Sequence, residues 1–243
     1  MESGRWRGPK MKMESKQQSK RVLDVWFEPV RLDYWNLTWQ EAEAFIKRFR
    51  AKAPERVAAL EKNVGSTPGF EDWRADFSAE SRRRLGPWLL AVARTSRVDP
   101  KDVRVEVRDG LDADIIAAME TIAKEIVTIE LSEQTAAMAV DIGIYIGEAV
   151  RAQYPSIQWR RCTARCSTNQ NYPLLESRTN RGWNPIVQLC NFAIALLEKR
   201  FEPECFERMY CDWLRGTAGT EEYRQRKIAK KLKDREARKK KAP

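Results

Sequence analysis

Histidine is absent from all 243 positions of the sequence. It is the usual general base near neutral pH and the commonest metal-binding side chain. Its absence excludes Ser-His-Asp triads, Cys-His nucleophile pairs and zinc sites that need a histidine ligand. The leading interpretation is therefore a protein that is not an enzyme, with no catalytic residues, no metal ligands and no cofactor.

Cysteine is scarce, and its spacing is uninformative. The five cysteines fall into the spacings CxxxC and CxxxxxC, and no CxxC pair occurs. A four-thiolate zinc site is not expected from this pattern. The odd number, the lack of a signal peptide and the lack of a disulfide-framework spacing favour a reducing, cytoplasmic location. Cys190 lies in the apolar run IVQLCNFAIALL, where we expect a small buried side chain.

Long hydrophobic runs are also missing. No stretch approaches 18 uninterrupted apolar residues, so no membrane span is predicted. Hydrophobic residues still make up 42% of the chain, and nine are tryptophan, which is enough for a substantial core. Length and composition predict one globular domain over 22–216, a disordered basic tail over 1–21 and a charged helix or tail over 217–243.

The positive charge is concentrated at the two ends of the chain. Residues 1–21 carry a net charge of +5 and residues 221–243 a net charge of +7, so the net charge of +10 leaves −2 for residues 22–220. A basic segment of this kind can neutralise phosphates of nucleic acid, or it can be a solvated tail. The candidate phosphate-binding residues are Arg226, Lys227, Lys230, Lys231, Lys233, Arg235, Arg238, Lys239, Lys240 and Lys241.

The first half of the chain reads mainly as helix. Thr38 followed by Glu41 forms a capping-box sequence, and the apolar spacing that follows predicts a helix ending at Gly65. Pro54 is expected to kink that helix or divide it in two. Ser78 is expected to cap another helix, which the Gly-Pro pair at 86–87 should interrupt.

Residues 102–107 alternate valine with charge, which predicts a strand, with a turn of helix as the alternative. The region 111–130 has helical spacing of isoleucine and methionine, and Ser132 can cap a further helix over 133–153. Two short strands are expected next, at SIQWRR and NYPLLES.

Helix starts follow at Asn184-Pro185 and at Pro203, and Gly216 should end the last helix of the domain. Thr220 can open a final charged helix. The fold class is therefore α+β and predominantly helical, with a central buried helix over about 133–153 packed against a small antiparallel sheet and further helices around it.

The stretch DIGIYIGE at 141–148 is unusual because two glycines interrupt an apolar helix. Each glycine costs about 1 kcal/mol relative to alanine inside a helix. Gly143 and Gly147 are four residues apart and share a face, so we expect another element to approach the backbone closely there.

Asp141, Tyr145 and Glu148 lie at i, i+4 and i+7 of the same helix. One interpretation is a carboxylate pair with a phenol between, suited to acid-base or metal chemistry in a hydrolase. The favoured interpretation is structural: each carboxylate meets an arginine or a strand-end amide. Four arginines are near in sequence: Arg151, Arg160, Arg161 and Arg165.

The same region resembles a group of uncharacterised bacterial α+β proteins, often from actinomycetes. The resemblance rests on Tyr145-x-Gly147-Glu148, a tryptophan at Trp159 in the following strand, Asn171-Tyr172-Pro173-Leu174-Leu175 and the Asn184-Pro185 helix start, and it spans about 22–216. It implies a small interaction or immunity-type protein without established chemistry. The basic tails and the missing histidines depart from that group.

Three functions are therefore considered. The first is a cytoplasmic, non-enzymatic binding protein, of immunity or adaptor type, whose partner is a protein. The second is a nucleic-acid-associated protein that binds phosphates non-specifically through its basic tails. The third, a hydrolase using Asp141 and Glu148, is the least favoured.

Overall fold

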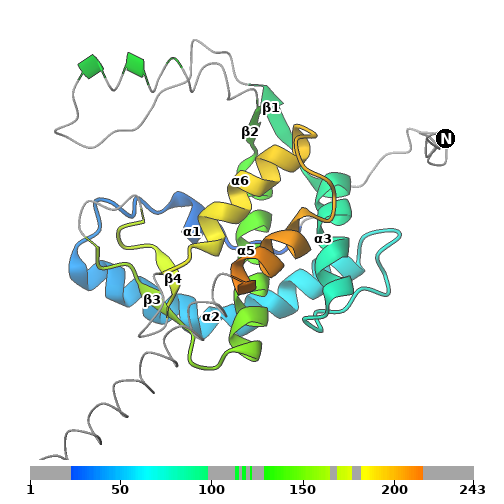
Figure 1. Cartoon of the computed structure of the whole chain (residues 1–243), viewed down its shortest axis with the longest axis horizontal. Helices are drawn as coiled ribbons and strands as arrows, with labels where there is room; N and C mark the ends of the chain where they lie inside the picture. Colours follow the sequence, from blue (N-terminus) through cyan, green and yellow to red (C-terminus); the bar gives the residue numbers. More distant parts are fainter. Residues whose placement is uncertain are drawn as a thin grey trace, which may run out of the picture.

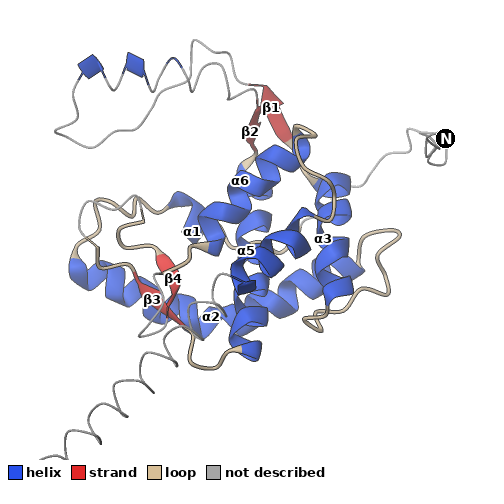
Figure 2. Ribbon diagram, viewed as in Figure 1, coloured by secondary structure: helices blue, strands red, loops and turns tan. Residues whose placement is uncertain are grey.

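The computed structural model describes residues 23–97, 113–114, 117–118, 121, 129–164, 169–176 and 182–215. Helices dominate these ranges, and two pairs of short strands lie at separate places (Figure 2). The elements are α1 (Glu28–Arg31), α2 (Trp39–Gly65), α3 (Ala79–Val92), β1 (Thr95–Arg97), β2 (Ile129–Leu131), α5 (Glu133–Gln153), β3 (Gln158–Arg161), β4 (Pro173–Glu176), α6 (Pro185–Leu197) and a helix over 205–215. The predominantly helical α+β class is confirmed.

The long helix α5 is the centre of the fold (Figure 1). It runs between α6 and α2, and most of its residues from Thr135 to Val150 are buried. Such a helix, apolar nearly all round, is expected only in the middle of a domain. The predicted central helix over 133–153 is therefore confirmed with the same bounds.

The glycine face of α5 is a packing surface. A Cβ atom added to Gly143 would lie 3.2 Å from the Cα atom of Ile186, at the start of α6. A Cβ atom added to Gly147 would lie 2.2 Å from the indole ring of Trp159 in β3. The two glycines therefore admit a helix backbone and a tryptophan ring, which confirms the predicted close approach.

Helix α2 is continuous across Pro54, so the predicted division at this proline is wrong. Proline removes one backbone hydrogen bond from a helix interior. Pro54 lies on the exposed side of α2, where water can reach the freed carbonyl, while the buried Ala53 and Arg56 hold the helix on the core. The Thr38–Glu41 capping box and the end at Gly65 are confirmed.

Helix α3 is also continuous through Gly86 and Pro87, contrary to the predicted interruption. The glycine serves a tertiary contact instead. A Cβ atom at position 86 would lie only 1.8 Å from the carbonyl oxygen of Pro203, in the turn that precedes the helix over 205–215. Gly86 therefore lets this turn lie directly on the backbone of α3. Pro203 was predicted to be the first residue of the helix, but it lies in the turn that precedes the helix, so this prediction is wrong.

The strands form two antiparallel pairs. In β3–β4, which matches the two predicted strands, Trp159 lies opposite Leu175. In β1–β2, Thr95 lies opposite Leu131, so residues 129–131 form a strand where a helix was expected to reach residue 130. Pairing with Thr95–Arg97 and the bond from the Ser132 N–H to the Arg94 carbonyl override the local helical spacing. The predicted strand at 102–107 lies outside the described residues.

The remaining helix starts follow the sequence. Ser78, Ser132 and Asn184 each accept a hydrogen bond from a backbone N–H in the first turn of α3, α5 and α6. The thiol-bearing Cys190 packs against the core but is only partly buried. Within the described ranges, no helix has both the length and the hydrophobicity of a membrane-crossing segment.

Candidate functional site

Asp141 is held by Arg56, an arginine of α2 that the sequence did not single out. The guanidinium donates from Nε to Oδ1 at 3.0 Å and from a terminal nitrogen to Oδ2 at 2.8 Å. Both side chains are almost fully buried, at 4% and 1% exposure. Burial raises the pKa of Asp141 to about 6, against the opposing effect of the Arg56 charge. The Asp141 carboxylate is therefore part of a buried ion pair.

Arg56 also holds the segment that precedes α1. It donates to the Asp24 carboxylate at 2.9 Å and to the Asp24 carbonyl at 2.7 Å. The Asn63 side chain accepts a hydrogen bond from the Asp24 N–H and donates one to the Asp24 carbonyl. One buried arginine therefore ties the extended segment 23–27 to α2 and α5.

Tyr145 faces α3 and the loop before it. Its hydroxyl lies 2.6 Å from Oγ of Ser81 and accepts the backbone N–H of Phe77 at 2.9 Å. The ring stacks on Phe77, whose φ of 59° places this residue in the left-handed region. Burial raises the pKa of the phenol, so the hydroxyl stays protonated. Tyr145 fastens the start of α3 to α5.

Glu148 faces the β3 strand. It accepts the indole N–H of Trp159 at 2.7 Å and pairs with Arg151 at 2.7 Å. Asp141, Tyr145 and Glu148 are thus held by three different parts of the chain. Their contacts fix α5 to α2, to the start of α3 and to β3.

Replacing Glu148 with leucine is expected to destabilise the fold by about 1–3 kcal/mol, because the buried Trp159 N–H loses its acceptor. Glu148→Gln keeps an acceptor oxygen and should cost less. Urea unfolding measures both. Glu80→Leu is the matched control, since Glu80 makes the same i,i+3 pair with Arg83 but is 70% exposed. Equal effects of Glu148→Leu and Glu80→Leu would show that the indole contact does not support the fold.

The helix over 205–215 is fastened to α3 by Arg82. The guanidinium donates to the Glu207 carboxylate and to the Phe77 carbonyl, and it stacks 3.8 Å above the ring of Tyr210. The side chains of Arg82 and Glu207 are only 7% and 13% exposed. Together with the Gly86–Pro203 contact, this buried pair fixes the helix in position.

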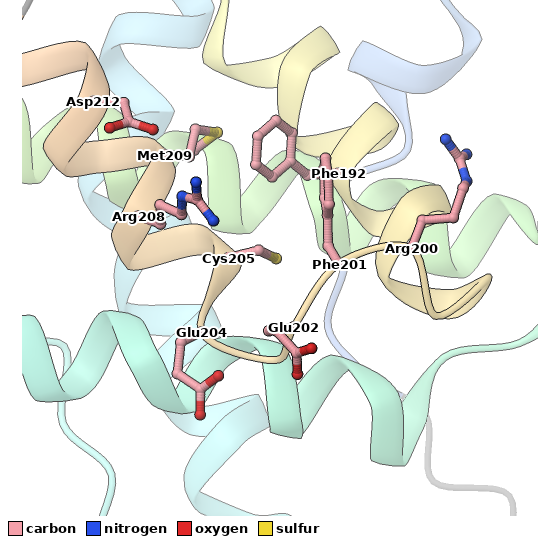
Figure 3. A pocket seen from close by; sticks show the side chains of 9 residues that line it. All are labelled: Phe192, Arg200, Phe201, Glu202, Glu204, Cys205, Arg208, Met209 and Asp212. Atoms are coloured by element: carbon pink, nitrogen blue, oxygen red, sulfur yellow. The ribbon is translucent and has the colours of Figure 1, made fainter.

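A surface pocket of about 400 Å³ lies between the helix over 205–215, the end of α6 and the chain that joins them (Figure 3). This volume is within the usual range of binding pockets. The residues that line the pocket are Phe192, Arg200, Phe201, Glu202, Glu204, Cys205, Arg208, Met209 and Asp212.

The pocket interior is apolar. The rings of Phe192 and Phe201 are 4.9 Å apart, and the buried side chains of Cys205 and Met209 lie beside them. Burial raises the pKa of the Cys205 thiol to about 12, so the thiol stays protonated and acts as an apolar group. Phe201 is 43% exposed, which is uncommon for so large an apolar side chain and leaves one face open to a ligand.

The pocket rim is charged. Arg200 pairs with Glu198, and Asp212 pairs with Arg215. Glu202, Glu204 and Arg208 make no ion pair within the described part of the chain. Figure 3 shows Glu202 and Glu204 together at one end of the pocket, with Arg208 and Met209 further along the helix. Three charges that have no ion-pair partner among the described residues therefore lie around an apolar interior.

The pocket was not visible in the sequence, because its lining comes from two helices and a turn that only the tertiary fold brings together. A weak signal was present in FEPE at 201–204, an aromatic residue and two carboxylates around a proline. The ten basic residues proposed from the C-terminal tail lie outside the described residues. In the described ranges, no group of three or more Cys, Asp or Glu side chains is placed to hold a metal ion.

No protein-family model, curated protein or solved structure matches this chain. The resemblance to uncharacterised bacterial proteins therefore remains a prediction from the sequence. The structure itself defines a predominantly helical α+β protein with an apolar surface pocket.

Proposed function

We propose that this chain is a cytoplasmic, non-enzymatic binding protein and that its pocket binds a segment of a protein partner. The observation that carries the proposal is the apolar pocket with Phe201 exposed at its edge. Aromatic residues, methionine and arginine are the residues enriched where proteins bind one another. The pocket offers Phe192, Phe201, Met209 and Arg208.

Two further observations support this function. The turn that carries Phe201 rests on α3 through Pro203 and Gly86, so the pocket is pre-formed, and a pre-formed site loses less entropy on binding. The described cysteines, Cys162, Cys190, Cys205 and Cys211, are free thiols, which favours a reducing compartment.

The replacement Phe201→Ala is expected to weaken partner binding by tenfold or more, about 1.4 kcal/mol, because it removes the exposed aromatic wall. The measurement is an interaction screen against a genomic fragment library, followed by titration of each hit with the purified full chain. Leu90→Ala is the matched control, since Leu90 is 42% exposed but belongs to α3. Hits that bind both variants as well as the unmodified chain would contradict the proposal.

A second candidate function is nucleic-acid binding through the tails, and the net charges of +5 and +7 on residues 1–21 and 221–243 favour it. The same screen separates the two functions. Binding through phosphates falls steeply with salt and is lost after nuclease treatment. Binding in the pocket persists under both conditions and depends on Phe201.

A further inference from the structure

The unpaired charges around the pocket indicate which kind of segment it binds. Glu202 and Glu204 contribute two negative charges and Arg208 one positive charge, while Arg200 and Asp212 are neutralised by their own partners. Among the described residues, the rim charge that is not neutralised by an ion pair is therefore negative, although the whole chain is strongly basic. An acidic segment would meet repulsion at this end of the pocket, and a basic one attraction.

The geometry of the turn supports the same conclusion. Glu202 and Glu204 flank Pro203, and the Pro203 carbonyl lies directly against the α-carbon of Gly86. Both carboxylates are exposed, yet the backbone that carries them is fixed beside the ring of Phe201 (Figure 3). Glu202 and Glu204 line the same pocket as Phe201, so a ligand in the apolar interior lies beside the segment that carries the two carboxylates.

From this arrangement we infer that the pocket recognises a peptide segment in which a large apolar side chain lies next to a lysine or arginine. The apolar side chain packs against the touching rings of Phe192 and Phe201 and over Met209. The basic side chain pairs with Glu202 and Glu204. Arg208, at the other side, donates to a backbone carbonyl of the segment, a role that needs no opposite charge. This inference rests on the proposed function, because it names the class of partner for the same pocket.

The two carboxylates also lie at the N-terminal end of the helix over 205–215, where negative charge stabilises a helix. This purely structural role and the proposed role make different predictions. A structural role predicts that removing the charges lowers the melting temperature and leaves ligand preference unchanged. The proposed role predicts a change in preference with the fold intact.

The experiment is selection of a random peptide library displayed on phage against the full chain, with counter-selection on the Phe201→Ala variant. We expect the enriched peptides to combine an aromatic or long aliphatic residue with an adjacent lysine or arginine. A synthetic enriched peptide should bind the Glu202→Gln/Glu204→Gln variant about tenfold more weakly. Its analogue with glutamine at the basic position should bind both proteins equally.

The control variant is Glu55→Gln/Glu130→Gln, which removes the same charge from exposed positions on α2 and β2 and should bind as the unmodified chain does. Melting temperatures of all variants check the fold. Phe201-dependent peptides with neutral or acidic neighbours would overturn this inference and leave the proposed function standing. Failure to enrich any Phe201-dependent peptide would overturn both.

Discussion

Replacement of Arg56 by methionine is expected to destabilise the fold by about 3–5 kcal/mol, the usual cost of removing one partner from a buried ion pair. Methionine keeps the apolar stem but leaves Asp141 buried without a cation and removes both Arg56 hydrogen bonds to Asp24. Few single replacements should have a larger effect, because Arg56 joins three segments. Urea unfolding followed by tryptophan fluorescence gives the free energy of unfolding.

The Arg48→Met variant is the matched control, since Arg48 lies on the same helix and pairs with Glu28 but is 51% exposed. It should change stability by less than about 1 kcal/mol. In a double-mutant cycle, Arg56→Met/Asp141→Asn should lower the free energy of unfolding by less than the sum of the two single replacements. The reason is that asparagine leaves no buried charge. Additive costs would contradict the ion-pair account.

The loss caused by Arg56→Met should also depend on pH. Burial already raises the pKa of Asp141 to about 6, and loss of the Arg56 charge removes the effect that opposes this rise. A folded-state pKa above the unfolded one means that the native protein binds the extra proton, so stability falls as the pH rises through that window. The destabilisation should therefore be greater near pH 8 than near pH 5. A loss independent of pH would show that Asp141 does not change its protonation.

Replacement of Gly86 by alanine should destabilise the protein by about 1–3 kcal/mol or more, although alanine is the better helix former. The added Cβ atom would lie 1.8 Å from the Pro203 carbonyl oxygen, a backbone atom with little freedom to move. The turn over 201–204 must shift, so the pocket should be lost as well. Thermal unfolding reports the first effect and binding of a pocket ligand the second.

The control for Gly86 is Gly65→Ala, at the last residue of α2. There the nearest atom to an added Cβ, the Glu71 carbonyl oxygen, is 3.8 Å away, which is an ordinary contact. This variant should be neutral or slightly stabilising. If Gly86→Ala were equally harmless, the turn at Pro203 would not be fixed on α3, and the argument for a pre-formed pocket would fail.

Features that depend on a few neighbouring residues were predictable from the sequence. The Thr38–Glu41 capping box and the Asn184-Pro185 helix start satisfy backbone groups within one turn, so their residue pattern is sufficient. The glycines at 143 and 147 predicted a close approach because each is unfavourable in a helix without one. Which elements make that approach, the start of α6 and the Trp159 ring, required the fold.

Features set by distant contacts were not predictable. Pro54 and Pro87 suggested breaks because local propensity disfavours proline in a helix, yet packing keeps α2 and α3 continuous. Arg56 lies 85 positions from Asp141, so nearby arginines were the natural candidates. The pocket depends on the contact between Gly86 and Pro203, which no local pattern encodes.

The most direct test of the central claim, that the pocket is the protein-binding site, is site-specific photo-crosslinking in cells. A photoreactive phenylalanine analogue replaces Phe201 in one variant of the chain and Leu90 in a second variant. The two positions are nearly equally exposed. The account predicts a discrete crosslinked partner from position 201 that is absent from position 90. Equal or absent crosslinking at the two positions would contradict it.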